Sequence, residues 1–170
     1  MENTDVQLRA AHLTDLAWIT AMDNDVFGEY GAAEAPTIIA ARLLTFPSGC
    51  VVLEEQRATG EPLQGVGYLT TEKWDMIREP ALDEDPRLTH KPHGHILNIT
   101  TLVVGRAHQK RGLGERLLAY AIDLARREQC TEIILETARA EAFYRRHGFE
   151  KMSERQQRGI SLQIMRLLLA

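Results

Sequence analysis

The chain has 170 residues, within the usual range for one domain, and its 44% hydrophobic and 6% aromatic content favours one mainly aliphatic core. Its net charge of -4 argues against a protein that binds nucleic acid through a basic surface. No apolar run approaches the ~20 residues that span a bilayer, and the start MENTDVQLR lacks the basic and apolar stretches of a signal peptide.

The first part of the chain predicts a strand, two helices and a hairpin. Residues 6–9 alternate apolar and polar side chains, as a short strand does. Helices are expected over 14–24, which begins at a capping threonine, and over 36–46, which begins with a proline. Two strands, 50–54 and 65–70, are separated by turn residues and should pair as an antiparallel hairpin.

The middle of the chain holds a long connection and the strongest strand signal. An acidic, proline-containing segment covers about 73–92, and connections of that length are usually functional or mobile. Residues 95–104, HILNITTLVV, are dense in β-branched side chains, which are typical of a strand.

The last part of the chain alternates helices and strands. An amphipathic helix is predicted over 113–127, a buried strand over 132–137, a helix over 138–147 that ends at a glycine, and a closing strand over 160–168. The strand–helix–strand order predicts a parallel pair, whereas the early hairpin indicates antiparallel neighbours. We expect one domain over residues 1–170 with an α/β fold: a mixed, mostly antiparallel sheet of six or seven strands, a central parallel pair, and helices on both faces.

The loop between the strong strand and the amphipathic helix has features of a phosphate site. Its residues 109–114, QKRGLG, lead into a helix N-terminus, where free backbone N–H groups and the helix dipole favour an anion. Gly112 and Gly114 let a ligand approach the backbone. Four basic side chains gather nearby and suit a ligand with several phosphates: Arg106, His108, Lys110 and Arg111.

Two other interpretations of this loop remain open. It can be a solvated basic turn that happens to contain two glycines. It can also be a dinucleotide-binding loop of the Rossmann type, with Glu136 holding a ribose. A Rossmann loop would carry a third glycine or alanine where Leu117 stands, and would follow the strand directly.

Two motifs together resemble the GNAT superfamily of N-acetyltransferases. The first is LVVGRAHQKRGLGERLL, a strand, a Gln-x-x-Gly-x-Gly loop and a helix; the second is ARAEAFYRRHGF at 138–149. The resemblance covers nearly the whole chain and implies acetyl-CoA as co-substrate. It implies that Leu102 and Val104 pair with the pantetheine amides, with the side chain of Val103 turned the other way. It also implies that a backbone run holds the pyrophosphate, namely Gln109, Lys110, Arg111, Gly112, Leu113, Gly114 and Glu115.

A second stretch is similar to the arylalkylamine N-acetyltransferases. It runs His90-Lys91-Pro92-His93-Gly94-His95 after the acidic segment, and Asp25-Val26-Phe27 matches that group's substrate loop. The resemblance implies that Phe27 and His95 contact the substrate. That group removes the amine's proton with two histidines on the central strand, but this chain has Asn98 and Thr100 at those positions.

The predicted chemistry needs a proton acceptor and a proton donor. An alkylamine with a pKa of about 10.4 is free base in less than roughly a thousandth of molecules at pH 7. Asn98 and Thr100 would share one face of their strand and can hold a water that relays the proton. Glu136 is a candidate carboxylate and His93 and His95 are candidate bases, although each can also be a solvated surface residue.

The leaving thiolate needs a proton, and the GNAT resemblance assigns this role to Tyr144. We predict a cytoplasmic enzyme that acetylates a primary amine of a small molecule by direct attack in a ternary complex. The alternative is a catalytically silent module that binds acyl-CoA. We expect a monomer or homodimer without metal, nucleic-acid or membrane partners. Cys50 and Cys130 should be buried thiols, since two cysteines make no disulfide framework.

Overall fold

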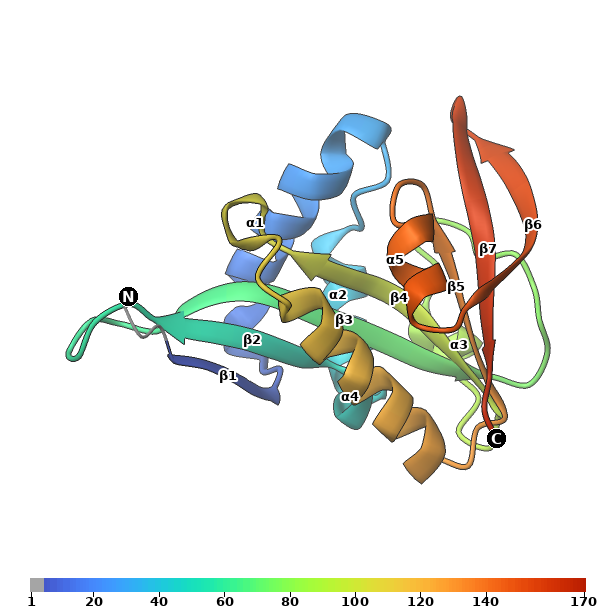
Figure 1. Cartoon of the computed structure of the whole chain (residues 1–170), viewed down its shortest axis with the longest axis horizontal. Helices are drawn as coiled ribbons and strands as arrows, with labels where there is room; N and C mark the ends of the chain where they lie inside the picture. Colours follow the sequence, from blue (N-terminus) through green and yellow to red (C-terminus); the bar gives the residue numbers. More distant parts are fainter. Residues whose placement is uncertain (1–4) are drawn as a thin grey trace.

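A seven-stranded sheet organises the protein in the computed structural model, which describes residues 5–170 (Figure 1). The strands lie in the order β1-β2-β3-β4-β5-β7-β6. They are β1 (Asp5–Ala10), β2 (Val51–Gln56), β3 (Gln64–Trp74), β4 (Ile96–Val104), β5 (Glu132–Thr137), β6 (Glu150–Gln157) and β7 (Ile160–Leu168). The helices are α1 (Leu16–Phe27), α2 (Pro36–Thr45), α3 (Pro86–Thr89), α4 (Leu113–Arg127) and α5 (Glu141–Arg146), with short 3-10 turns between some of them.

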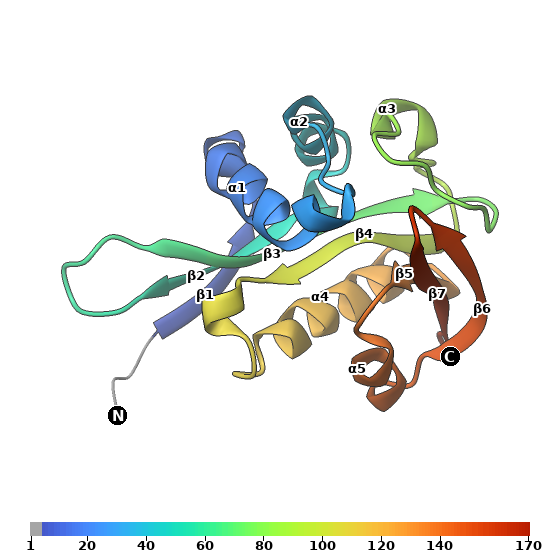
Figure 2. The same cartoon turned by 90° about the horizontal axis from the view of Figure 1, so that it is seen from above.

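Neighbouring strands pair antiparallel throughout, except that β4 and β5 are parallel. Helices α1, α2 and α3 cover one face of the sheet, while α4 and α5 cover the other (Figure 2). The mixed sheet with one parallel pair and helices on both faces is therefore confirmed, as is the early hairpin of β2 and β3.

Each face of the sheet has its own apolar cluster. On one face α4 buries a stripe that includes Leu117, Ala121 and Leu124, each no more than 1% exposed. Burying one leucine contributes roughly 2 kcal/mol, so this amphipathic stripe is enough to fix α4 on the sheet. On the opposite face, Ile19 of α1 packs with Tyr68 and other residues of the second cluster.

The parallel pair is short, and this opens the sheet in the middle. Only Ile96, Leu97 and Asn98 of β4 pair with β5, although both strands continue beyond these residues. The β3–β4 register shifts so that Thr100 of β4 is an extra, bulged residue. Beyond the bulge β4 bonds only to β3, and the two parallel strands diverge (Figure 1). The backbone groups on that side of β4 can therefore pair with a ligand.

Several predicted boundaries were wrong, and packing explains the differences. The first helix continues to Phe27 instead of ending at 24, because Met22, Val26 and Phe27 all pack on the second apolar cluster. Strand β3 continues to Trp74, so the long connection starts later than predicted and contains the short helix α3. Helix α5 spans only Glu141–Arg146.

Strand β6 was not predicted at all. Its sequence, EKMSERQQ, is almost entirely polar, because it is an edge strand with no fully buried face. Cys50 and Cys130 are buried free thiols, as predicted. None of the helices within residues 5–170 is long and apolar enough to cross a membrane.

Candidate active site

The divergence of β4 and β5 opens into a cavity of about 930 Å³ that passes through the sheet. Its walls come from both strands, the N-terminus of α4, helix α5 and the end of α1. Most of the residues predicted from the sequence line this cavity. They are Phe27, Asn98, Thr100, Leu102, Val103, Val104, Gln109, Lys110, Gly112, Leu113, Gly114, Glu115, Glu136 and Tyr144.

The loop before α4 has a backbone that leaves its N–H groups accessible. Gly112 caps the helix in a left-handed conformation, with φ 77°, and no atom lies within 4 Å of where its Cβ would be. Lys110 also has a positive φ, 65°. A Cβ on Gly114 would lie 3.5 Å from the ring of Phe143, so the loop packs closely against α5. The first N–H groups of a helix have no helical acceptor, and the first-turn residues Leu113, Gly114 and Glu115 of α4 line the cavity.

The four basic side chains near the loop do not all serve the cavity. Arg111 donates to Glu55 of β2 over 2.8 Å, and the ring of His108 lies 3.4 Å from the same carboxylate. Both side chains therefore anchor the loop to the sheet. Arg106 and Lys110 both line the cavity, and Arg106 also pairs with Asp25 of α1 over 3.3 Å.

Strand β4 presents different residues to its two faces. Leu102 and Val104 are half-buried and pack on the α4 side, whereas Val103 is buried in the α1 cluster. The side-chain amide of Asn98 donates to the carbonyl of Ile134 over 3.1 Å, at the last paired position of the parallel strands. The hydroxyl of Thr100 hydrogen bonds that of Thr70 over 2.6 Å.

Tyr144 lies on α5 and is only 5% exposed. Its ring makes edge contacts with Phe143 and Phe149, at centroid distances of 5.1 and 5.3 Å. Burial raises the pKa of the Tyr144 phenol, since the phenolate would lose its hydration. The group therefore stays protonated and can donate a proton into the cavity that it lines.

Glu136 lies on β5 but is already engaged. Both of its oxygens accept from Arg155 of β6, at 2.8 to 3.1 Å. Arg155 also donates to the carbonyl of Pro80 over 3.1 Å and so ties the long connection between β3 and β4 to the cavity rim. The ion pair organises this end of the cavity.

His93 and His95 are not brought to the cavity. Both side chains are exposed, and His95 precedes β4 at the end opposite the divergence. The stretch around them instead packs on β3. His90 stacks on Phe46 at 4.7 Å, and its Nδ1 accepts the N–H of Lys73 over 3.0 Å. A Cβ on Gly94 would meet the Trp74 carbonyl oxygen at 2.4 Å, so only glycine fits there.

Sequence reasoning missed a polar cluster on the α1 side of the cavity. Asp23 accepts the Tyr68 hydroxyl on one oxygen over 2.9 Å and the Glu34 N–H on the other over 2.8 Å. Glu34 in turn holds Arg42 through hydrogen bonds of 3.0 to 3.1 Å. Asp23, Glu34 and Arg42 all line the cavity. No local pattern revealed them, because Asp23, Glu34 and Arg42 come from α1, the following loop and α2, and Tyr68 lies 45 positions from Asp23.

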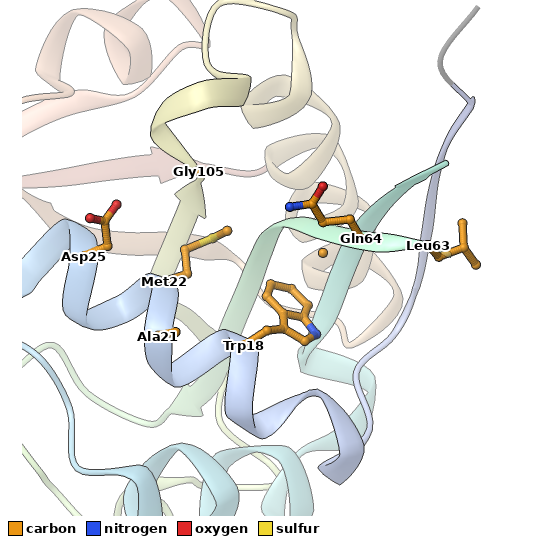
Figure 3. A pocket seen from close by; sticks show the side chains of 8 residues that line it. Trp18, Ala21, Met22, Asp25, Leu63, Gln64 and Gly105 are labelled. Atoms are coloured by element: carbon orange, nitrogen blue, oxygen red, sulfur yellow. The ribbon is translucent and has the colours of Figure 1, made fainter. Parts of the chain in front are cut away.

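A second cavity, of about 470 Å³, lies between α1, the start of β3 and Gly105. Figure 3 shows Trp18 and Met22 extending from α1 toward the start of β3 and Gly105. Its carboxylate, Asp25, already pairs with Arg106. It contains none of the predicted site residues, so the larger cavity is the candidate active site.

Comparisons with known proteins agree with this geometry. A family model described as "Acetyltransferase (GNAT) family" matches residues 18–149. Ard1 from Thermoplasma volcanium is similar in structure, with a TM-score of 0.74, 14% identity, and coverage of 97% of this chain and 98% of that one.

Two further solved structures have the same fold. The putative acetyltransferase yncA from Salmonella typhimurium with its cofactor acetyl-CoA has a TM-score of 0.67 and 22% identity, covering 97% of this chain and 94% of that one. The ribosomal-protein-alanine N-acetyltransferase from Brucella melitensis has a TM-score of 0.67 and 23% identity, covering 96% and 99%. A search among curated protein sequences found no match.

Proposed function

The chain belongs to the acetyltransferase (GNAT) family, and from that premise we propose that it transfers an acetyl group from acetyl-CoA to the primary amine of a small molecule. The main support for this proposal is that a single cavity is lined by the α4 N-terminus, the open edge of β4, Tyr144, and the carboxylates of Asp23 and Glu34. These are the parts that a direct attack in a ternary complex requires.

Acetyl-CoA enters from the side of α4 and α5. The backbone of 109–115 holds its pyrophosphate, because the helix N-terminus offers free N–H groups and positive dipole charge. The pantetheine then runs along β4 at Leu102 and Val104, where β4 has no partner strand on that side. Its amides replace the missing strand, while Val103 points into the opposite apolar cluster.

Tyr144 supplies the proton for the leaving thiolate. Its buried phenol remains protonated in the resting protein, so it is ready as the donor when the C–S bond breaks. A phenol with a raised pKa is a weaker acid. The cavity, however, disfavours the thiolate as well as the phenolate, and the thiolate accepts the proton as it leaves.

The amine approaches from the face covered by α1 and α2. Asn98 and Thr100 hold a water that takes up the ammonium proton, and Glu136, the carboxylate expected from the sequence, lies on β5 and holds Arg155 at the rim. Phe27 provides an apolar wall for the substituent of the amine.

A small acceptor fits the way the cavity is covered. Near the cavity rim, hydrogen bonds hold the connection between β3 and β4 to other elements: Arg155 donates to Pro80, and Asp83 accepts the Ala35 N–H over 2.8 Å. An extended peptide needs an open groove, whereas this connection lies across the rim and its residues Pro80, Ala81 and Leu82 line the cavity.

Free-thiol release from acetyl-CoA with a panel of primary amines tests the proposal. We expect release that depends on both substrates, with product carrying one acetyl group on nitrogen. Binding of acetyl-CoA without release on any amine would instead support a silent acyl-CoA-binding module.

A further inference from the structure

Asp23 of α1, which the sequence did not single out, is a buried carboxylate in the cavity wall. Among the buried carboxylates it has an unusual environment. Its side chain is 2% exposed and lines the cavity, yet within residues 5–170 it forms no ion pair. The hydrogen bonds that hold it come from a phenol and a backbone N–H, and both donors are uncharged.

The surroundings of Asp23 carry more negative than positive charge. Glu34 and Glu72 lie nearby in the network, and both share the guanidinium of Arg42, at 3.0 and 3.5 Å. Arg78 lies 3.5 Å from Glu72 and is 29% exposed. Arg78 also binds Glu84 over 2.7 Å, so four carboxylates of this network, those of Asp23, Glu34, Glu72 and Glu84, share two cations, Arg42 and Arg78. A buried carboxylate without a cation is costly, so this wall favours a cationic ligand.

Asp23 also lies where the acceptor must pass. Its partner Tyr68 pairs with Val103 on β4, in the part of that strand beyond the bulge. Two residues along β3, Thr70 bonds the hydroxyl of Thr100. Because residues i and i+2 of a strand share a face, Tyr68 and Thr70 form a polar line from Asp23 to the proposed relay at Thr100.

We infer that Asp23 attracts the ammonium group of the acceptor into the cavity and receives its proton, by way of the water at Asn98 and Thr100. This inference rests on the proposed function and assigns the acceptor class as a primary alkylammonium. Glu136 is a poorer acceptor because both of its oxygens already bind Arg155, and protonation would break those charge-assisted bonds.

The step balances in atoms and charge. The Asp23 carboxylate takes one proton from R–NH₃⁺, and the freed lone pair of nitrogen forms the C–N bond at the thioester carbon. The C–S bond breaks, the thiolate takes the phenol proton of Tyr144, and the second proton lost by nitrogen restores that phenol. Products are the amide, free CoA thiol and one proton, which Asp23 returns to solvent.

The electrostatics of Asp23 support this role. Burial raises its pKa, opposed by the hydrogen bonds from Glu34 and Tyr68 and by the charge of Arg42. The negative charge of Glu34 raises it further. A carboxyl with a raised pKa is a stronger base than an exposed one, and Tyr68 keeps it aimed.

The test is Asp23→Asn, assayed with 2-phenylethylamine and 1,4-diaminobutane. Asparagine has the same shape, and it can accept from Glu34 and donate to the Tyr68 oxygen, so the fold is retained. We expect kcat/KM for the amine at pH 7 to fall about 100-fold, with acetyl-CoA affinity unchanged. The deficit should shrink toward pH 10, where the amine loses its proton unaided. Asp15→Asn is the matched control, since Asp15 is equally buried but lies outside the cavity, and it should retain wild-type kinetics.

A second variant keeps the test valid if Asp23→Asn does not fold. Tyr68→Phe removes one hydrogen bond to the carboxylate and should move the acid limb of the kcat/KM profile to higher pH. Unchanged kcat/KM in Asp23→Asn, a deficit that is constant from pH 7 to 10, or an unmoved acid limb in Tyr68→Phe would overturn the inference. If the wild-type protein acetylates no primary amine of the panel, the proposed function itself fails, which is a separate result.

Discussion

Tyr68 of β3 donates its hydroxyl proton to Asp23 of α1 over 2.9 Å, across 45 positions of sequence and inside the cavity wall. This hydrogen bond fixes α1 over the open part of the sheet. It also holds the Asp23 carboxylate at the place where an amine would enter the cavity. Among the described residues this carboxylate forms no ion pair.

The raised pKa of Asp23 should appear in the pH dependence of the protein's free energy of unfolding. A carboxyl whose pKa is higher in the folded state contributes stability at low pH, and that stability is lost as pH rises through the folded pKa. Asp23→Asn does not titrate. Its free energy of unfolding, measured by urea denaturation, should therefore rise relative to that of wild type as the pH increases from about 4, the unfolded pKa, through the higher folded pKa.

Asp15 should give the opposite pH dependence of the free energy of unfolding. Arg9 and the His12 N–H hold the pKa of Asp15 well below its usual range. A depressed pKa contributes stability above the unfolded value, which is lost as pH falls. Asp15→Asn should cost about 2 kcal/mol at pH 7 and progressively less below pH 4. Parallel pH trends in the two variants would contradict one of the two assignments, and the sign of the shared trend would show which.

Tyr144→Phe tests the proton donor. Phenylalanine retains the contacts with Phe143 and Phe149 but has no proton to give the thiolate. Turnover should fall about 100-fold, while acetyl-CoA affinity and the melting temperature stay close to wild type. Turnover equal to wild type would remove Tyr144 from the mechanism.

Gly112→Ala tests the backbone of the phosphate loop. At φ 77° an alanine is strained by about 1 kcal/mol, and relief of that strain would move the N–H groups that hold the pyrophosphate. Acetyl-CoA should bind more weakly by calorimetry. Gly60→Ala is the matched control: φ is 89°, no atom lies within 4 Å of the new Cβ, and the residue is outside the cavity. Equal binding losses in both variants would contradict the assignment.

Glu136→Gln tests whether Glu136 accepts the proton in place of Asp23. Losing the charge weakens the hold on Arg155, which ties down Pro80 at the rim. We expect KM for the amine to rise about tenfold, a loss of about 1.4 kcal/mol, with kcat within about twofold. Arg155→Gln should give the same pattern. A 100-fold fall in kcat for Glu136→Gln alone would instead make Glu136 the proton acceptor.

The parts of the fold that the sequence predicted are those with strong local signals. The apolar stripe of α4 was predicted with its boundaries, 113–127, because every turn repeats the pattern. The parallel pair followed from the strand–helix–strand order. Strand β6 was missed because an edge strand buries little and so carries no alternation.

The candidate site was only partly predictable, for a similar reason. The QKRGLG loop is one contiguous motif, so its place beside the cavity could be expected. The partners of Asp23 and Glu136 come from other elements, and no periodicity encodes such contacts. The histidine stretch 90–95 suggested a substrate site, but its residues have packing contacts instead. Gly94 lies against Trp74, and His90 stacks on Phe46.

We propose that the slot between β4 and β5 holds an acyl-CoA with its diphosphate at Gly112. Calorimetric titration of the wild-type protein with acetyl-CoA, and separately with a nicotinamide adenine dinucleotide, tests this binding mode. We predict saturable one-site binding of acetyl-CoA and no heat with the dinucleotide. Binding of the dinucleotide, with none of acetyl-CoA, would contradict the account.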